Sequence, residues 1–150
     1  MSEAWRRRGL YLAGAWNIVG GLTALADPAR HFAQFYGTGL SLGDPLQAFF
    51  FRVTWINVIA WGLAYVLAAR HRAARTPVLV AGGAGKLAYC SACAGLVVGG
   101  IGGVALLVSG VVDGLFAAFF VAVLWGPRSG PPPGGSPPGF LELRTGVGEG

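Results

Sequence analysis

The fold is decided by one stretch, residues 77–124, which reads PVLVAGGAGKLAYCSACAGLVVGGIGGVALLVSGVVDGLFAAFFVAVL. As one helix this stretch would be about 70 Å long, at a rise of about 1.5 Å per residue. The hydrocarbon core of a bilayer is only about 30 Å thick, so a single helix would be far too long for it. The glycine-rich segment at 99–103 therefore predicts a tight hairpin between two spans, at 77–98 and 104–124.

Two further apolar stretches precede this hairpin, at 9–26 and 46–69. Hydrophobic residues make up 54% of the chain and charged residues only 11%, against about 25% charged residues in soluble domains. This composition excludes most soluble enzymes and nucleic-acid-binding proteins. The sequence thus predicts an all-α fold, a four-transmembrane-helix bundle over residues 1–125.

Proline dipeptides mark the expected helix starts. Asp44 with Pro45, and Thr76 with Pro77, each predict an N-cap followed by the first helical residue of a span. Asp27 before a proline predicts a short helix in the loop between the first two spans. All nine prolines are then expected outside the span interiors.

The short helix is expected to be amphipathic, because three aromatic residues fall on one of its faces at helical spacing: Phe32, Phe35 and Tyr36. We expect this helix to lie on the outer membrane surface, with a lid over a ligand site as the alternative.

The amino-acid composition changes at the end of the chain. Six of the nine prolines and eight glycines fall within 126–150, which predicts a disordered tail.

Charge predicts the orientation of the chain. Arginines precede the first span at positions 6–8, lie between the second and third spans at 70–75, and follow the fourth. The positive-inside rule then predicts cytoplasmic termini in a bacterial inner membrane, with the lipid bilayer as partner. This asymmetry explains the pI of 9.9 without a nucleic-acid partner. Alternatively, residues 1–26 form a signal peptide cleaved after Ala26, which would leave three spans.

Each predicted span carries one strongly polar residue near its middle. These residues form a candidate intramembrane polar site: Asn17, Asn57, Lys86 and Asp113. An ionisable group at this depth costs about 2.5–3.5 kcal/mol on insertion scales, so it normally faces the bundle interior. Because the glycine hairpin makes its two helices neighbours, we expect an ion pair between Lys86 and Asp113. The site either fixes helix register or binds a substrate, an ion or a proton.

Small residues accompany these polar positions. Asp113 lies within Gly110-x-x-x-Gly114, and the first span carries a stripe of glycine and alanine on the side of Asn17. Small residues let helix backbones approach closely. The glycine-rich faces predict close packing within the bundle, and also a homo-oligomer or a larger membrane complex.

Two other features offer candidate functional residues. Arg52, near the outer end of the second span, is expected either to anchor at the headgroups or to attract an anion to a cavity mouth. Cys90 and Cys93 have the C-x-x-C spacing of thiol redox sites, with ordinary packing as the alternative. The sequence predicts no metal site and no cofactor.

This layout resembles small bacterial four-helix membrane proteins of the DoxX-like or domain-of-unknown-function kind. The resemblance covers residues 9–125 and rests on the short four-span layout, the arginines before a glycine-rich first span and the polar residues within the membrane. For some such families it implies thiol or quinone redox work, which would involve Cys90 and Cys93.

Three hypotheses on function follow. The first is a non-catalytic accessory or self-associating membrane component. The second is a small transporter or ligand-binding protein that uses the intramembrane polar residues. The third is a membrane thiol oxidoreductase.

Overall fold

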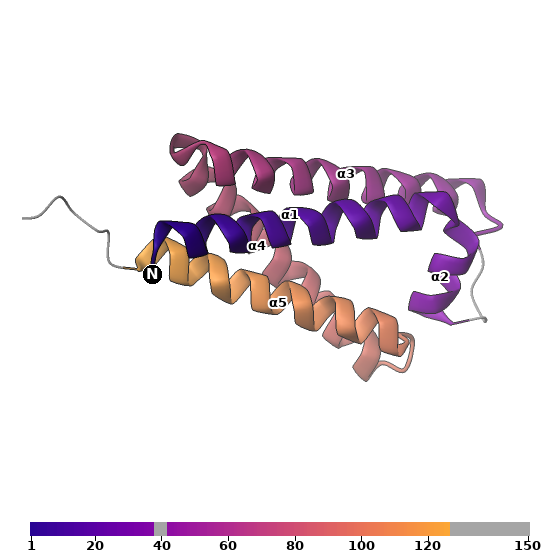
Figure 1. Ribbon diagram of the computed structural model, residues 1–150. Helices are drawn as coiled ribbons and strands as arrows, with labels where there is room; N and C mark the ends of the chain where they lie inside the picture. Colours follow the sequence, from indigo (N-terminus) through magenta and orange to yellow (C-terminus); the bar gives the residue numbers. More distant parts are fainter. Residues whose placement is uncertain (38–41, 127–150) are drawn as a thin grey trace, which may run out of the picture.

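The computed structural model of the protein describes residues 1–37 and 42–126. This part of the chain consists of helices joined by short connections: α1 (Glu3–Ala26), α2 (Pro28–Tyr36), α3 (Pro45–Arg70), α4 (Arg72–Val98) and α5 (Val104–Trp125). Figure 1 shows the four long helices as a bundle, with the short α2 across one end. The tail expected at 126–150 lies outside the described residues from 127 onward.

Four of these helices are long and apolar enough to cross a membrane, with 24, 26, 27 and 22 residues in α1, α3, α4 and α5. The protein is therefore a multi-pass membrane protein, and the predicted all-α, four-transmembrane bundle is confirmed. The first span begins earlier than expected, at Glu3 rather than residue 9. The hydroxyl of Ser2 accepts the backbone N–H of Trp5 and so caps this longer helix.

Two of the three predicted helix starts are confirmed. The carboxylate of Asp27 accepts the N–H of Arg30 at the start of α2, and Asp44 caps α3 in the same way. The third prediction was wrong, because α4 begins at Arg72 and contains Pro77 in its second turn. A proline there removes only one backbone hydrogen bond.

The glycine hairpin is confirmed between Val98 and Val104. Gly100 has a φ of +73°, a left-handed conformation that side chains other than glycine rarely adopt. The N–H of Ile101 then donates to the carbonyl of Leu96 across the turn. This geometry lets α5 return directly alongside α4.

The bundle consists of two closely packed helix pairs, α1 with α3 and α4 with α5. Glycines make both contacts close. A Cβ on Gly14 of α1 would lie 2.9 Å from the carbonyl oxygen of Gly62 of α3, and one on Gly110 of α5 only 2.7 Å from the Cβ of Cys93. These contacts account for several of the predicted small-residue faces within one chain, so those faces require no second copy.

The two pairs meet at one end of the bundle, here called the closed end, where Glu3, Arg70 and Trp125 lie. A buried apolar core fills this end: Leu10, Ala13, Tyr65, Ala68, Ala69, Leu79, Phe120 and Val123. Figure 1 shows α1 and α5 diverging from there toward the opposite end, which α2 covers. The N–H of Gly103, before α5, donates to the carbonyl of Phe35 and ties α2 to the hairpin.

Candidate functional site

A cavity of about 1020 Å³ lies between the two helix pairs, from the middle of the bundle to the underside of α2. All five helices contribute to its walls. The larger aromatic side chains that line the cavity are Trp16, Phe32, Phe35, Tyr36, Phe50, Phe51, Trp55, Trp61, Tyr65 and Tyr89. This volume lies at the upper end of the usual range for small-molecule sites, which are concave, mostly apolar and carry a few polar groups.

The deep end of the cavity carries a polar cluster of Asn17, Lys86 and Asp113. The Lys86 ammonium donates to the Asp113 carboxylate over 2.6 Å and to the Asn17 side-chain carbonyl over 3.1 Å. These residues come from α4, α5 and α1, so the structure brings together three of the four predicted polar residues. The Lys86 side chain is 4% exposed and that of Asp113 is 13% exposed.

Aromatic rings surround the ammonium of this cluster. Its nitrogen lies 5.6 Å from the centre of the Tyr65 ring and 5.3 Å from that of Phe116. Such rings attract a cation through their negative faces. The Lys86 ammonium thus contacts one carboxylate, one amide oxygen and two ring faces.

A second polar pair lies closer to α2. The hydroxyls of Tyr89 and Ser109 are 3.1 Å apart, and both residues line the cavity. The sequence interpretation did not select them. Their positions offered the signal, since Tyr89 is three residues beyond Lys86, and Ser109 four residues before Asp113, at the spacing of shared helix faces.

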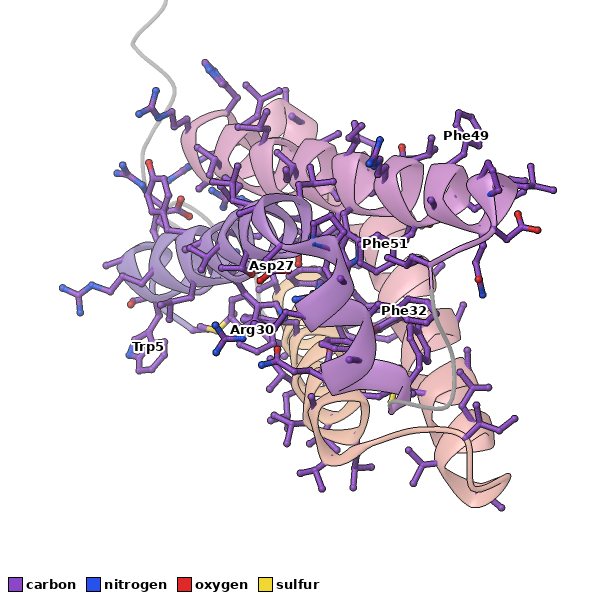
Figure 2. All side chains as sticks on the ribbon, turned by 90° about the vertical axis from the view of Figure 1, so that its right-hand side faces the viewer. Trp5, Asp27, Arg30, Phe32, Phe49 and Phe51 are labelled. Carbon is purple, nitrogen blue, oxygen red and sulfur yellow. The ribbon has the colours of Figure 1, made fainter. Side chains whose placement is uncertain are left out.

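The helix α2 forms a roof over the cavity. Its place on the outer membrane surface and its alternative role as a lid stay predictions. The His31 ring stacks on Phe35 at 4.5 Å and meets the edge of Trp55 at 4.6 Å. Figure 2 shows Phe32 of α2 beside Phe51 of α3, and their ring centres are 5.8 Å apart. Burial of the imidazole lowers the pKa of His31, which keeps the ring neutral near pH 7.

The fourth predicted polar residue, Asn57, does not join this cluster. Its amide is exposed and donates to the carbonyl of Val53 on its own helix. Arg52 is also exposed, and neither residue lines the cavity. The position of Asn57 in the sequence indicates its depth along the helix axis, but not the direction in which its side chain points. The face of α3 that meets the cavity carries Trp55 and Val58 instead, and Asn57 points to a different side.

The two cysteines are free thiols that pack against α5. A Cβ on Gly114 would lie 3.1 Å from the sulfur of Cys90, and Cys93 fits over Gly110 with 2% exposure. Neither cysteine lines the cavity, and the described residues contain no cluster of three metal-ligating side chains. This geometry gives the cysteines a packing role, and their redox role stays a prediction.

An ion cluster at the closed end was not predicted from the sequence. The Arg75 guanidinium donates to both carboxylate oxygens of Glu3, over 3.1 and 2.9 Å, and to the carbonyl of Ala68. It ties the start of α1 to the corner between α3 and α4. A lone glutamate before an apolar span was the available signal, but its partner is 72 residues away.

No protein-family model, curated protein or solved structure matches the chain. The resemblance to DoxX-like proteins therefore stays a prediction.

Proposed function

We propose that the protein binds an amphipathic small molecule inside the membrane. The polar end of the ligand meets the cluster of Asn17, Lys86 and Asp113, and its apolar body lies along the aromatic walls. One observation carries this proposal: the cluster forms the deep end of a cavity of about 1020 Å³. A polar group that only fixed helix register would need no such space beside it.

The cluster has hydrogen-bonding capacity left for a ligand. An ammonium has three donors, and the described contacts of Lys86 use two of them. The described hydrogen bond to Asp113 uses one carboxylate oxygen, Oδ1. The site can therefore offer both a donor and an acceptor, while the aromatic walls bury the rest of the molecule.

The closed end favours binding over passage through the bundle. Tyr65 and Phe120 lie between the cavity and this end, are 1% and 0% exposed, and have ring centres 5.0 Å apart. Beneath them the core continues with Leu10 and Leu79, also essentially inaccessible. A ligand that reaches Lys86 meets this packed layer, so we assign a receptor or carrier role rather than a channel.

A second candidate is a non-catalytic accessory or self-associating component, in which the polar cluster only holds helices together. The observation that favours it is the burial of Lys86, which bonds to both α1 and α5. In either case we propose a bacterial inner membrane protein with cytoplasmic termini, because the arginines at 6–8 and 70–75 gather at one end.

The proposal is tested by extraction of small molecules from purified protein in nanodiscs. Wild type should retain a compound above the level of the surrounding lipid, and Asn17→Leu should lose it. Asn57→Leu is the matched control, because it removes the same amide from the same bundle outside the cavity. Equal retention by all three proteins would contradict ligand binding at the cluster.

A further inference from the structure

We infer that the cavity takes its ligand sideways from the lipid bilayer, through gaps between the two helix pairs. The ligand class that this route selects is a neutral, membrane-dissolved molecule with a hydroxyl or carbonyl head group. This inference rests on the proposed function and adds the path and the charge of the ligand to it.

Both ends of the cavity are covered by the described residues. At the deep end, the packed rings of Tyr65 and Phe120 lie beneath Lys86. At the other end, the rings of α2 cover the cavity, with His31 between Phe35 and Trp55. The hydrogen bond from Gly103 to Phe35 holds this roof against the start of α5.

The gap between α3 and α4 opens within one helical turn. A Cβ on Gly82 would clash with the ring of Tyr65, so the helices touch there. A Cβ on Gly85, three residues further, would meet nothing within 4 Å. Gly85 and Trp61 both line the cavity and are both exposed. We take this opening between α3 and α4 as a lateral window, because lipid surrounds the bundle in a membrane.

A second window lies between α1 and α5. The two helices touch at the closed end, where Gly9 packs on Phe119. Further along, Trp16 of α1 and Val108 of α5 line the cavity while 40% and 50% exposed. This window therefore lies between the closed end and the roof made by α2.

The lining residues select the ligand by charge. The windows are edged by apolar, aromatic or small side chains, such as Val19, Thr54, Val58 and Val108. Among the described lining residues, the Asp, Glu, Lys and Arg side chains are those of Lys86 and Asp113, which pair with each other at 2.6 Å. A charged head group would bring an unbalanced charge into this apolar space, which is costly. A neutral head with a hydroxyl or carbonyl can use the remaining donor and acceptor.

The length of the site suits a lipid-like body. Lys86 and Leu96 both line the cavity on α4, and ten residues of helix span about 15 Å. The ligand body thus extends along the bundle from the polar cluster toward the roof, parallel to the lipid chains outside.

Cross-linking α2 to the bundle tests whether the ligand enters laterally or past α2. In a Cys90→Ala, Cys93→Ala background, Gln34→Cys and Val104→Cys, at two positions that do not line the cavity, allow a short, reducible bis-methanethiosulfonate cross-linker to join α2 to the start of α5. The two helices are close there, because a Cβ on Gly103 would lie 3.0 Å from the carbonyl oxygen of Gln34. The probe is a glycerol monoester with a dibrominated stearoyl chain, added to nanodiscs after cross-linking. Loading is measured as saturable quenching of Trp55, taken as the difference from a Trp55→Phe control.

Lateral access predicts that cross-linked and reduced proteins load the probe at the same rate and to the same extent. Loading that occurs only after reduction would overturn the lateral route while leaving the binding site in place. Quenching that never saturates, in either form, would overturn the proposed function together with the route.

Two further experiments test the window between α3 and α4 and the preference for a neutral ligand. Gly85→Phe should slow loading, whereas Gly95→Phe should not, because Gly95 also has open space but does not line the cavity. The ionised stearate and the matching alkylamine, with the same brominated chain, should quench Trp55 less than the glycerol ester. Stronger quenching by either charged probe would contradict a neutral ligand.

Discussion

The Lys86 ammonium and the Asp113 carboxylate lie 2.6 Å apart at the deep end of a cavity that reaches the opposite end of the bundle. They come from adjacent helices joined by the glycine hairpin. Each residue alone would be a poor choice for a bilayer interior, because an unpaired charge there is costly. Pairing offsets this cost, and the cavity leaves space beside the pair.

This pair can be tested by a double-mutant cycle. Lys86→Met and Asp113→Leu should each lower the free energy of unfolding by about 3–5 kcal/mol, because each leaves an uncompensated buried charge. The double variant should recover much of that loss. Stability is measured by denaturant titration in detergent micelles. Losses that simply add in the double variant would show that the two residues do not interact.

The contact between α4 and α5 predicts a small loss of stability for cysteine substitutions and a large loss for a glycine substitution. Cys90→Ala with Cys93→Ala should cost only about 1 kcal/mol, since the changes remove one buried and one half-buried sulfur. Gly110→Leu should lower stability far more, because even a Cβ would lie 2.7 Å from the Cβ of Cys93. Gly95→Leu, which meets open space, is the matched control.

Thiol chemistry of the wild-type protein distinguishes a packing role from a redox role. Buried packing cysteines should resist membrane-impermeant alkylating agents in the folded protein. Rapid labelling of either thiol, or a disulfide that forms and breaks with the redox potential of the buffer, would favour the oxidoreductase hypothesis instead.

The roof should loosen in acid. The pKa of His31 is lowered from 6.5 by burial, so the folded protein binds the proton less readily than a state with α2 undocked. The stabilisation by neutral His31 is complete above pH 6.5 and is lost as the pH falls toward the lowered value. The rings that face it from α3, Phe51 and Trp55, carry no charge that could offset the imidazolium.

Trp55 fluorescence measures this change directly, because the indole meets the His31 ring at 4.6 Å. Wild type and His71→Gln should show the same acid transition, since His71 lies at the closed end. His31→Phe should remove it. A transition that persists in His31→Phe would assign the acid response to another group.

Topology is tested by reporter fusions at residue 72 and after residue 126. The charge distribution predicts a cytoplasmic reporter at both points. A reporter on the far side of the membrane at either position would contradict the proposed orientation. Cleavage after Ala26, seen in the intact mass, would support the signal-peptide alternative.

The sequence predicted the helices well because length and hydropathy act locally. The glycine cluster at 99–103 and the caps at Asp27 and Asp44 gave correct boundaries, whereas Pro77 gave a false one. The helix continues through Pro77 from Arg72, and Arg75 in its first turns pairs with Glu3, a residue far away in the sequence. A contact between residues 72 positions apart cannot be found from local rules.

The site was only half predictable for a similar reason. Depth along each helix brought Asn17, Lys86 and Asp113 to one layer, and the hairpin made two of their helices neighbours. Depth says nothing of rotation about the helix axis, so Asn57 was placed wrongly. The cavity itself lies between the two helix pairs, whose arrangement depends on contacts between residues far apart in the sequence, such as that of Gly9 with Phe119.

The central claim is that this cavity holds a ligand against the Lys86–Asp113 pair, and native mass spectrometry of protein released from nanodiscs tests it most directly. Wild type should carry one defined adduct of constant mass. The Lys86→Met, Asp113→Leu double variant, folded but without the polar pair, should carry none. An adduct of the same mass and occupancy on both proteins, or only a ladder of bulk phospholipid on each, would contradict the claim.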